Sequence, residues 1–265
     1  MDNRALCAAG AALVRREAPL RDLLGYDPGA LDDDTALFAE VLARAVPEGP
    51  ARGAARAIAR RHFSGPLGAI AAEDVAATAR RDADPGGGIA TLLFANGLHA
   101  LLGHRLAHAV LGDGLTASAL ALKGHFLRAF GADIWPQARI GRRVWIDHGL
   151  GLVIGQTAVI EDDVSLWHGV TLGSNLVDRG DARHPRLRRG CVIGAHAQLI
   201  GPVEIGAGAV VAAGAVVTGD VPPGALAVGA RARLLEGRAR PAAALGIPLG
   251  DPPGGPSGDQ PGGPA

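Results

Sequence analysis

The first 130 residues carry apolar side chains at the spacing of amphipathic α-helices. Apolar residues recur every three or four positions in several segments with Gly or Pro between them, at 36–46, 53–62, 67–81, 89–111 and 115–130. Asp33, Asp34 and Thr35 precede the first of these segments and offer N-cap side chains. The segments and their short connections predict a packed, antiparallel α-helical domain over residues 1–130.

From Ile140 onward the apolar period changes to six residues. Most members of the new aliphatic series follow the previous one by six positions: Ile140, Ile146, Ile154, Ile160, Leu166, Leu172, Ile193, Leu199, Ile205, Val211 and Val217. A period of six fits neither an α-helix nor a long alternating strand, but it fits a chain that turns a corner every six residues. We therefore predict a triangular prism of stacked, parallel-paired coils over residues 131–236, with the aliphatic side chains inside.

Two irregularities interrupt the six-residue series. Eight residues separate Ile146 from Ile154, which predicts a small bulge. Twenty-one residues separate Leu172 from Ile193, so we predict a charged loop over residues 174–190 that leaves the prism. A long polar excursion from a regular scaffold is typical of a functional segment. Beyond the prism, residues 237–265 are rich in Pro and Gly and predict a disordered tail.

Composition and charge narrow the class of protein. Lys plus Arg (26) equals Asp plus Glu (26), which lacks the basic excess of a nucleic-acid-binding protein. The two cysteines, Cys7 and Cys191, form neither a disulfide framework nor a zinc spacing, as in proteins of a reducing compartment. No segment reaches the roughly 18 uncharged apolar residues that span a membrane. We therefore expect a cytoplasmic protein that contacts no membrane.

Several short segments of the chain form a recognisable set. They are Asp133-Ile134-Trp135-Pro136, Ile146-Asp147-His148, Gly155-Gln156-Thr157-Ala158-Val159-Ile160, Val170-Thr171-Leu172-Gly173, Asp181-Ala182-Arg183-His184-Pro185 and Val221-Pro222-Pro223-Gly224. With the helical region before them, they resemble the serine O-acetyltransferases, a family of hexapeptide-repeat acyltransferases. The resemblance covers about residues 60–236. It implies an α+β fold in which the helical domain precedes a left-handed parallel β-helix.

The resemblance also implies an activity, acetyl transfer from acetyl-CoA to the hydroxyl of L-serine, which gives O-acetyl-L-serine and CoA for cysteine biosynthesis. His148 resembles the catalytic base of the family, and Asp133 resembles its carboxylate partner. Imidazole suits the task because its unperturbed pKa lies near the working pH. A carboxylate beside it would fix its tautomer and stabilise the imidazolium.

Serine is a zwitterion, so its site needs charges of both signs. Asp147 resembles the family residue that meets the ammonium and the hydroxyl. A second aspartate comes from the helical domain, where an ungapped count selects Asp82 and the Asp-Pro dipeptide selects Asp84. On the loop, Arg183 and His184 resemble the residues that hold the substrate carboxylate, a charge-assisted role that suits arginine.

Acetyl-CoA, by the same resemblance, lies along the prism in a groove between neighbouring protomers, and no metal is expected. Backbone amides near Gly173 and Ser174 would face the thioester oxyanion, although the family has Gly-Gly-Thr where this chain has Gly173-Ser174-Asn175. Arg231 and Arg233 would meet the nucleotide phosphates.

The expected assembly is a homotrimer or a dimer of trimers. Docking to cysteine synthase is doubtful, because the sequence ends in Pro264-Ala265 and lacks the terminal isoleucine that the family uses.

Other functions fit parts of the pattern. The same fold could acetylate another small acceptor, such as homoserine or an amino sugar. A zinc hydratase needs a closely spaced histidine pair on the coils, which this sequence lacks, and a pure scaffold would leave the Asp-His pair without a purpose. His104 and His108 stand four apart on a predicted helix without a third ligand, so we interpret them as a packed helix face. His168 and His196 lie on the coils and receive no role.

Overall fold

The computed structural model describes residues 4–83, 86–177 and 182–229. Three predicted site residues, Asp84, Arg231 and Arg233, lie outside these ranges, as does the predicted tail at 237–265. No helix within the described ranges is long and apolar enough to cross a membrane.

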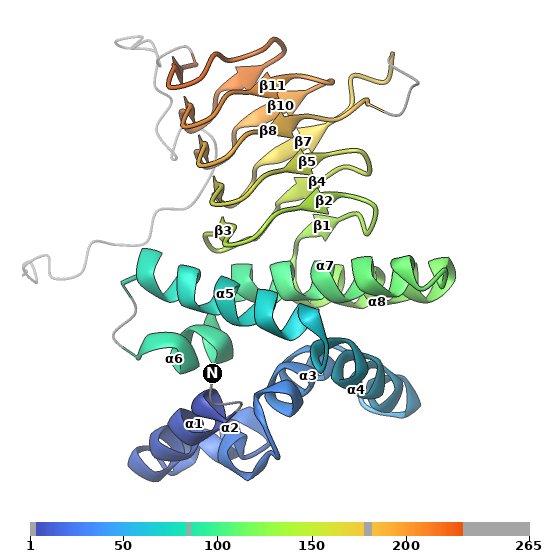
Figure 1. Cartoon of the computed structure of the whole chain (residues 1–265), viewed down its shortest axis with the longest axis vertical. Coiled ribbons are helices and arrows are strands. Elements are labelled where there is room, and N and C mark those ends of the chain that lie inside the picture. Colours follow the sequence, from blue (N-terminus) through green and yellow to red (C-terminus); the bar gives the residue numbers. More distant parts are fainter. Residues whose placement is uncertain (1–3, 84–85, 178–181, 230–265) are drawn as a thin grey trace, which may run out of the picture. The chain divides into compact units, whose positions relative to one another are not determined.

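Helices occupy the first half of the described chain, and the coils follow them (Figure 1). The helices are α1 (Ala5–Arg16), α2 (Pro19–Leu24), the 3₁₀ turn η1 (Pro28–Ala30), α3 (Asp34–Arg44), α4 (Pro50–Phe63), α5 (Pro66–Arg81), α6 (Gly87–Phe94), α7 (Asn96–Gly112) and α8 (Thr116–Phe130). Asp33 caps α3, because its Oδ1 accepts a hydrogen bond from the amide of Ala36 at 2.8 Å.

The segment 89–111, predicted as one helical stretch, is divided between α6 and α7 at Ala95, whose backbone is extended (φ −79°, ψ 102°). The break lets the start of α7 lie against the first coil. A Cβ at Gly97 would be only 1.9 Å from the carbonyl oxygen of Ile146, so only glycine permits this approach. Contact with a distant part of the chain therefore overrides the local helical periodicity.

The second half forms three parallel sheets that make the sides of the predicted prism. Sheet A holds β1 (Asp133–Ile134), β4 (Val153–Ile154), β7 (Thr171–Gly173), β10 (Gln198–Ile200) and β13 (Val216–Val217). Sheet B holds β2 (Arg139–Ile140), β5 (Val159–Ile160), β8 (Arg186–Leu187) and β11 (Glu204–Ile205). Sheet C holds β3 (Trp145–Ile146), β6 (Ser165–Leu166), β9 (Val192–Ile193), β12 (Val210–Val211) and β14 (Leu226–Ala227). The predicted left-handed β-helix is confirmed.

The aliphatic repeat fills the interior of the prism. Every member of the series from Ile146 to Val217 is at most 7% exposed, and only Ile140 in the first coil is half-buried. Leu187 belongs to the same series, six residues before Ile193, and pairs in register with Ile160 and Ile205. The predicted loop at 174–190 is thus too long, because the chain is back in the prism at β8. Cys191 is fully buried four residues after Leu187, as a small core residue.

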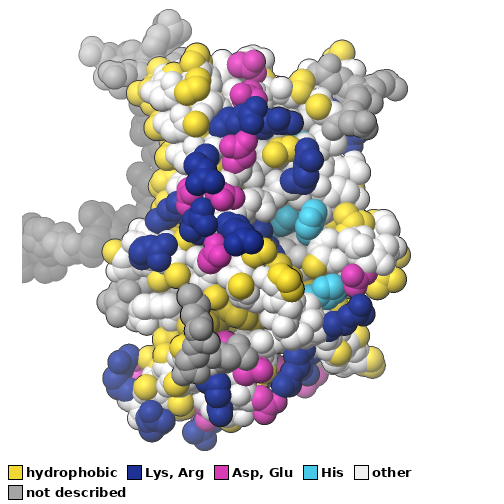
Figure 2. Space-filling model, viewed as in Figure 1, with side chains coloured by type: hydrophobic (Ala, Val, Ile, Leu, Met, Phe, Trp, Pro, Cys, Tyr) yellow, Lys and Arg dark blue, Asp and Glu magenta, His cyan; other side chains and the backbone are white. Residues whose placement is uncertain are grey.

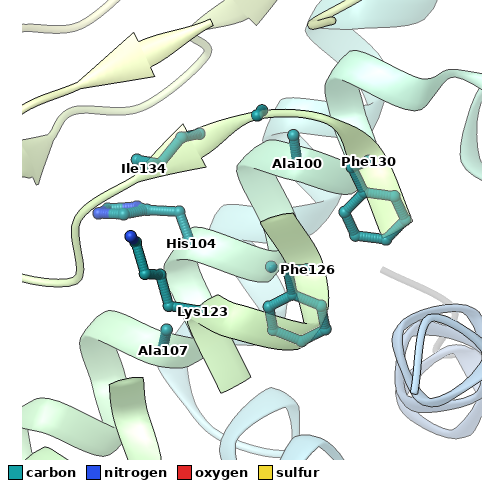
Figure 3. Close-up of a pocket in the computed structure, with 9 residues that line it drawn as sticks. Ala100, His104, Ala107, Lys123, Phe126, Phe130 and Ile134 are labelled. Atoms are coloured by element: carbon teal, nitrogen blue, oxygen red, sulfur yellow. The ribbon is translucent and has the colours of Figure 1, made fainter. Parts of the chain in front are cut away.

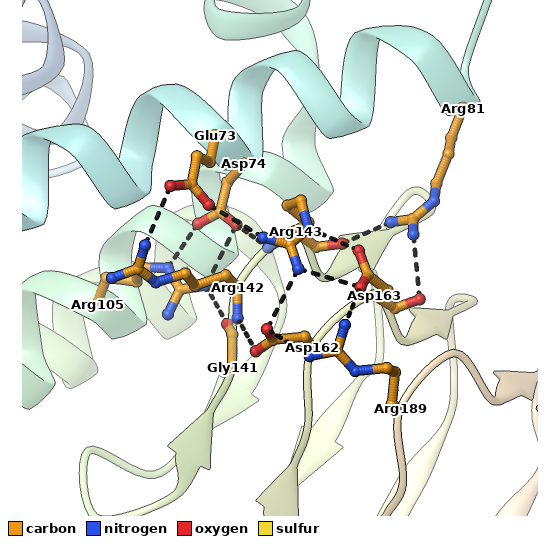
Figure 4. Close-up of polar contacts among 10 residues, drawn as sticks. All are labelled: Glu73, Asp74, Arg81, Arg105, Gly141, Arg142, Arg143, Asp162, Asp163 and Arg189. Carbon is orange, nitrogen blue, oxygen red and sulfur yellow. Dashed lines mark hydrogen bonds and ion pairs between the residues drawn. The ribbon is translucent and has the colours of Figure 1, made fainter. Parts of the chain in front are cut away.

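Charged side chains fasten the helices to the first coils (Figure 4). Arg105 of α7 pairs with the buried Asp74 of α5 at 2.6 Å and also donates to the backbone carbonyls of Ile140 and Gly141. Arg143 reaches from the turn after β2 to Asp163 at 2.7 Å. The Arg105 contacts join α5 and α7 to the end of β2 and the turn after it, and the Arg143 contact joins that turn to the corresponding turn of the next coil.

Ion pairs continue up the coils beyond this junction. Arg188 pairs with Glu161 at 2.8 Å and with Glu204 at 2.6 Å, on the coils to either side of its own. Figure 2 shows basic and acidic side chains interleaved on this face. Arg188 and Arg189 are therefore members of ion pairs along the prism rather than of a protruding loop.

Candidate active site

Apart from Asp82 at the end of α5 and Asp133 in β1, the predicted site residues that the structure describes fall on two of the three edges of the prism. The C–A edge is the line of turns that lead from sheet C to sheet A, at residues 147–152, 167–170, 194–197 and 212–215. The A–B edge is the line of turns that lead from sheet A to sheet B, at residues 135–138, 155–158, 174–185 and 201–203. The width of sheet A separates these edges within one chain.

His148 projects from the C–A edge because the predicted bulge lies there. The turn at 147–152 is two residues longer than the next turn on the same edge. His148 has a left-handed backbone (φ 59°), and Asn96 of α7 donates a hydrogen bond to its carbonyl at 2.8 Å. A non-glycine residue in this conformation is strained, and such strain collects at functional sites. The result is an imidazole whose side chain is 67% exposed.

A cleft of about 460 Å³ opens beside His148. It is lined by Asp82, Phe94, Ala95, Asn96, Gly97, Ile146, Asp147, His148 and Leu150. Asp147 Oδ2 lies 3.4 Å from His148 Nε2, and Asp82 Oδ1 accepts a hydrogen bond from Trp145 Nε1 at 2.7 Å. The structure thus brings together a histidine and two carboxylates that come from α5 and the first coil.

Asp133 of β1 forms an ion pair with a lysine of the helical region. Its Oδ1 is 2.5 Å from Lys123 Nζ of α8, and no hydrogen bond within the described ranges joins it to His148. The Lys123 ammonium also lies 4.7 Å from the centre of the Trp135 ring, a cation–π contact. In this structure the carboxylate nearest to His148 is therefore that of Asp147.

His104 and His108 pack α7 beneath the first coil. Each ring bonds a backbone carbonyl of that coil, His104 to Ala138 at 3.2 Å and His108 to Pro136 at 2.6 Å. Burial lowers the pKa of His104 to about 3, so this ring is neutral. Figure 3 shows it beside Lys123 in a small cavity below β1. Their geometry fits the packed helix face proposed from the sequence.

The loop residues Arg183 and His184 lie on the A–B edge, away from the cleft. Arg183 Nη2 donates to Gln156 Oε1 at 2.6 Å, and His184 Nδ1 is 2.8 Å from Thr157 Oγ1. Burial, with a smaller effect from the Arg183 charge, lowers the pKa of His184. Gly173 and Ser174 are also on this edge, at the end of β7. Within one chain these four residues do not reach His148.

His168 and His196, which received no role from the sequence, lie on the C–A edge with His148. The ring centres of His148 and His168 are 5.4 Å apart, and those of His168 and His196 are 5.0 Å apart. The sequence held a signal for the first pair. Strands β3 and β6 pair in register, and His148 and His168 each stand two positions after the aliphatic residue of the strand before them. Asp147, His148 and His168 each offer a ligand atom within 4.8 Å of the others.

Known sequences match part of the chain. The family described as "Bacterial transferase hexapeptide (six repeats)" matches residues 184–219. A serine acetyltransferase of Salmonella typhimurium is 43% identical over 140 residues, which is 53% of this chain and 51% of that protein. The chain thus spans about half the length of the curated relatives it matches.

Solved structures match more of the chain, including the helices. The serine acetyltransferase of Neisseria gonorrhoeae in complex with serine has a TM-score of 0.79 at 31% identity, covering 86% of this chain and 95% of that one. The serine acetyltransferase of Brucella abortus in complex with Coenzyme A has a TM-score of 0.79 at 31% identity, covering 86% and 92%. By sequence and by structure, the chain belongs to the serine acetyltransferase family.

Proposed function

We propose that the protein transfers the acetyl group of acetyl-CoA to the hydroxyl of L-serine and releases O-acetyl-L-serine and CoA. The observation that carries this proposal is the cleft that holds His148 together with Asp82 and Asp147. The imidazole can act as a base toward the serine hydroxyl, and the two carboxylates can bind the serine ammonium. Family membership favours the same reaction, since one relative's structure holds serine and another's holds Coenzyme A.

His148 is the general base in this proposal. A serine hydroxyl is a weak nucleophile at neutral pH, so the imidazole takes its proton as the oxygen attacks the thioester carbonyl. The tetrahedral intermediate then collapses, the carbon–sulfur bond breaks, and the imidazolium returns the proton to the CoA thiolate. The exposed ring at the C–A edge leaves room for both substrates. The proposed role of Asp133 is to orient this ring, and its ion pair with Lys123 involves Oδ1.

Asp82 and Asp147 bind the serine ammonium in this proposal. Both line the cleft, and no Lys or Arg is among the lining residues within the described ranges. The negative character of the cleft suits a cation. It also means that the serine carboxylate needs a positive partner from elsewhere.

A second copy of the chain supplies that partner. Arg183, His184, Gly173 and Ser174 lie on the A–B edge, across sheet A from His148. In a closed ring of identical copies, one edge of each copy meets a different edge of the next. We infer a homotrimer, alone or as a dimer of trimers, in which the A–B edge faces the neighbour's C–A edge. Arg183 then binds the serine carboxylate, and the Gly173–Ser174 backbone faces the thioester oxygen.

Two inactive variants are expected to restore activity to each other. His148→Ala lacks the base and Arg183→Ala lacks the carboxylate partner, so neither homo-oligomer turns over serine efficiently. If each site combines two copies, random mixing leaves about a quarter of the sites with both residues intact. We expect co-expressed variants to show about a quarter of wild-type CoA release at low serine concentration. Activity no greater than the sum of the two parents would place the whole site within one copy.

Serine is expected to be the best acceptor. A site built for its length discriminates against one added methylene by about 10–200-fold. We therefore expect kcat/KM for L-serine to exceed that for homoserine by this factor, and glucosamine to react more slowly still. CoA thiol release from acetyl-CoA with each acceptor measures this. Faster transfer to homoserine or to the amino sugar contradicts the proposed substrate.

A further inference from the structure

A trio of metal-ligating side chains lies on the C–A edge beside the cleft. It consists of Asp147, His148 and His168, and one ligand atom of each lies within 4.8 Å of the other two. The trio joins two coils, because His148 belongs to the first coil and His168 to the next. We propose that these three residues bind a divalent transition-metal ion of the zinc class, and that the bound ion blocks the base.

The separation of the first two ligand atoms suits such an ion. Asp147 Oδ2 and His148 Nε2 are 3.4 Å apart, close to the separation of about 3.4 Å between two N or O ligands of a tetrahedral zinc ion. The rings of His148 and His168 meet at 60°, with their centres 5.4 Å apart. Because the His148 side chain is 67% exposed, an ion can enter from solvent without opening the fold.

His168 is not committed to another role. Its Nδ1 is buried and has no hydrogen-bond partner within the described ranges, so no protein group there competes for this nitrogen. His104 also has a buried Nδ1 without a partner, but its other ring nitrogen bonds a backbone carbonyl, as do the rings of His99 and His108. A buried nitrogen without a partner favours a ligand at that position.

The surrounding charge also favours a cation. Asp82 lines the cleft together with Asp147, and no Lys or Arg lines it within the described ranges. Two imidazoles and one carboxylate leave a fourth tetrahedral position open to water. This mixed N/O set binds Zn²⁺ and Co²⁺ in preference to Mg²⁺ or Ca²⁺, which select oxygen ligands.

Binding has one chemical consequence. The imidazole lone pair that coordinates a metal cannot accept the proton of a serine hydroxyl, so metal and substrate compete for His148. This consequence rests on the proposed function, whereas the binding of metal does not.

Cobalt titration of the full chain tests the site directly. The protein is used without a histidine tag and stripped of metal, and visible absorption of bound Co²⁺ is recorded, with Zn²⁺ added to displace it. We expect one saturable site per chain and at least about tenfold weaker binding for His168→Gln. The matched control is His196→Gln, one coil further along the edge and outside the trio, for which we expect the wild-type dissociation constant.

Three results would overturn the site. The first is a Co²⁺ absorption that does not saturate. The second is a wild-type affinity for Co²⁺ in His168→Gln. The third is a loss of Co²⁺ affinity in His196→Gln equal to that in His168→Gln. Thermal unfolding checks that each variant is folded, and Asp147→Asn replaces His168→Gln in the same titration if the latter is not.

A second measurement separates the site from the proposed function. At buffered free Zn²⁺, acetyl transfer by the wild type is expected to be half-inhibited at a concentration about tenfold lower than in His168→Gln. Saturable Co²⁺ binding without this difference would refute the blocking of His148. If the wild type transfers no acetyl group to any acceptor, the proposed function fails, but the cobalt titration still decides the metal site.

Discussion

His148→Ala is expected to lower kcat for acetyl transfer to L-serine by about 10²–10⁴-fold, the usual contribution of a general base. The substitution removes the only imidazole that lines the cleft within the described ranges, and imidazole is the side-chain group whose unperturbed pKa lies near neutrality. CoA thiol release at saturating serine and acetyl-CoA measures the loss. Because the ring is 67% exposed, its removal should leave the thermal unfolding temperature and the oligomer size unchanged.

The matched control for this variant is His125→Ala. His125 lies on α8, where its Nδ1 is 3.3 Å from Arg128, and it does not line the cleft. We expect this control to keep wild-type turnover. If His148→Ala also kept it, His148 would not be the base, and the assignment of the cleft as the active site would be wrong.

The coils could be predicted from the sequence because each position in a six-residue repeat has a local environment. An aliphatic residue that recurs at every turn must point the same way in every coil, and the structure buries all but the first. Leu187 and Cys191 keep this register, six and two residues before Ile193, although the charged residues around them suggested a loop. The position in the six-residue repeat therefore predicts burial better here than the charge of the neighbouring residues does.

The division of the segment 89–111 could not be predicted, because its cause is not local. The helix breaks at Ala95 so that Gly97 can lie against the carbonyl of Ile146, which is far away in sequence. Helical periodicity reports only which face of a segment is apolar. It carries no information about which glycine touches another element.

The sequence predicted the candidate site in part. His148 stands in a bulge of the repeat, and a bulge in a regular scaffold marks a place where a side chain is turned outward. The partner of Asp133 was not visible, since the ion pair with Lys123 depends on how α8 joins the first coil at Gly131, a left-handed residue. Nor does the sequence by itself state which edge of the prism carries each turn, so it does not show that Arg183 and His148 stand on different edges.

Arg105→Ala is expected to lower the free energy of unfolding by about 3–5 kcal/mol, the usual cost of removing one partner from a buried ion pair. Arg105 is 6% exposed and Asp74 is fully buried, at 2.6 Å from each other (Figure 4). Burial raises the pKa of the Asp74 carboxyl, and Arg105 opposes that rise. Without the guanidinium, the Asp74 carboxyl keeps the backbone amide of Arg143 as a donor but loses its charged partner, and two backbone carbonyls of the first coil lose the Arg105 donor. Urea unfolding at fixed protein concentration measures the change.

The matched control is Arg60→Ala, which removes an equally short ion pair at the surface. Arg60 lies 2.6 Å from Asp32, but both side chains are exposed, so its loss should cost at most about 1 kcal/mol. The double variant Asp74→Leu with Arg105→Leu should recover part of the lost stability, because it leaves no buried charge behind. Equal losses in Arg105→Ala and Arg60→Ala would mean that the Asp74–Arg105 pair does not hold α5 and α7 to the coils. The stability of that junction would then come from its other contacts, among them the ion pairs of Glu73 with Arg142 and Arg143.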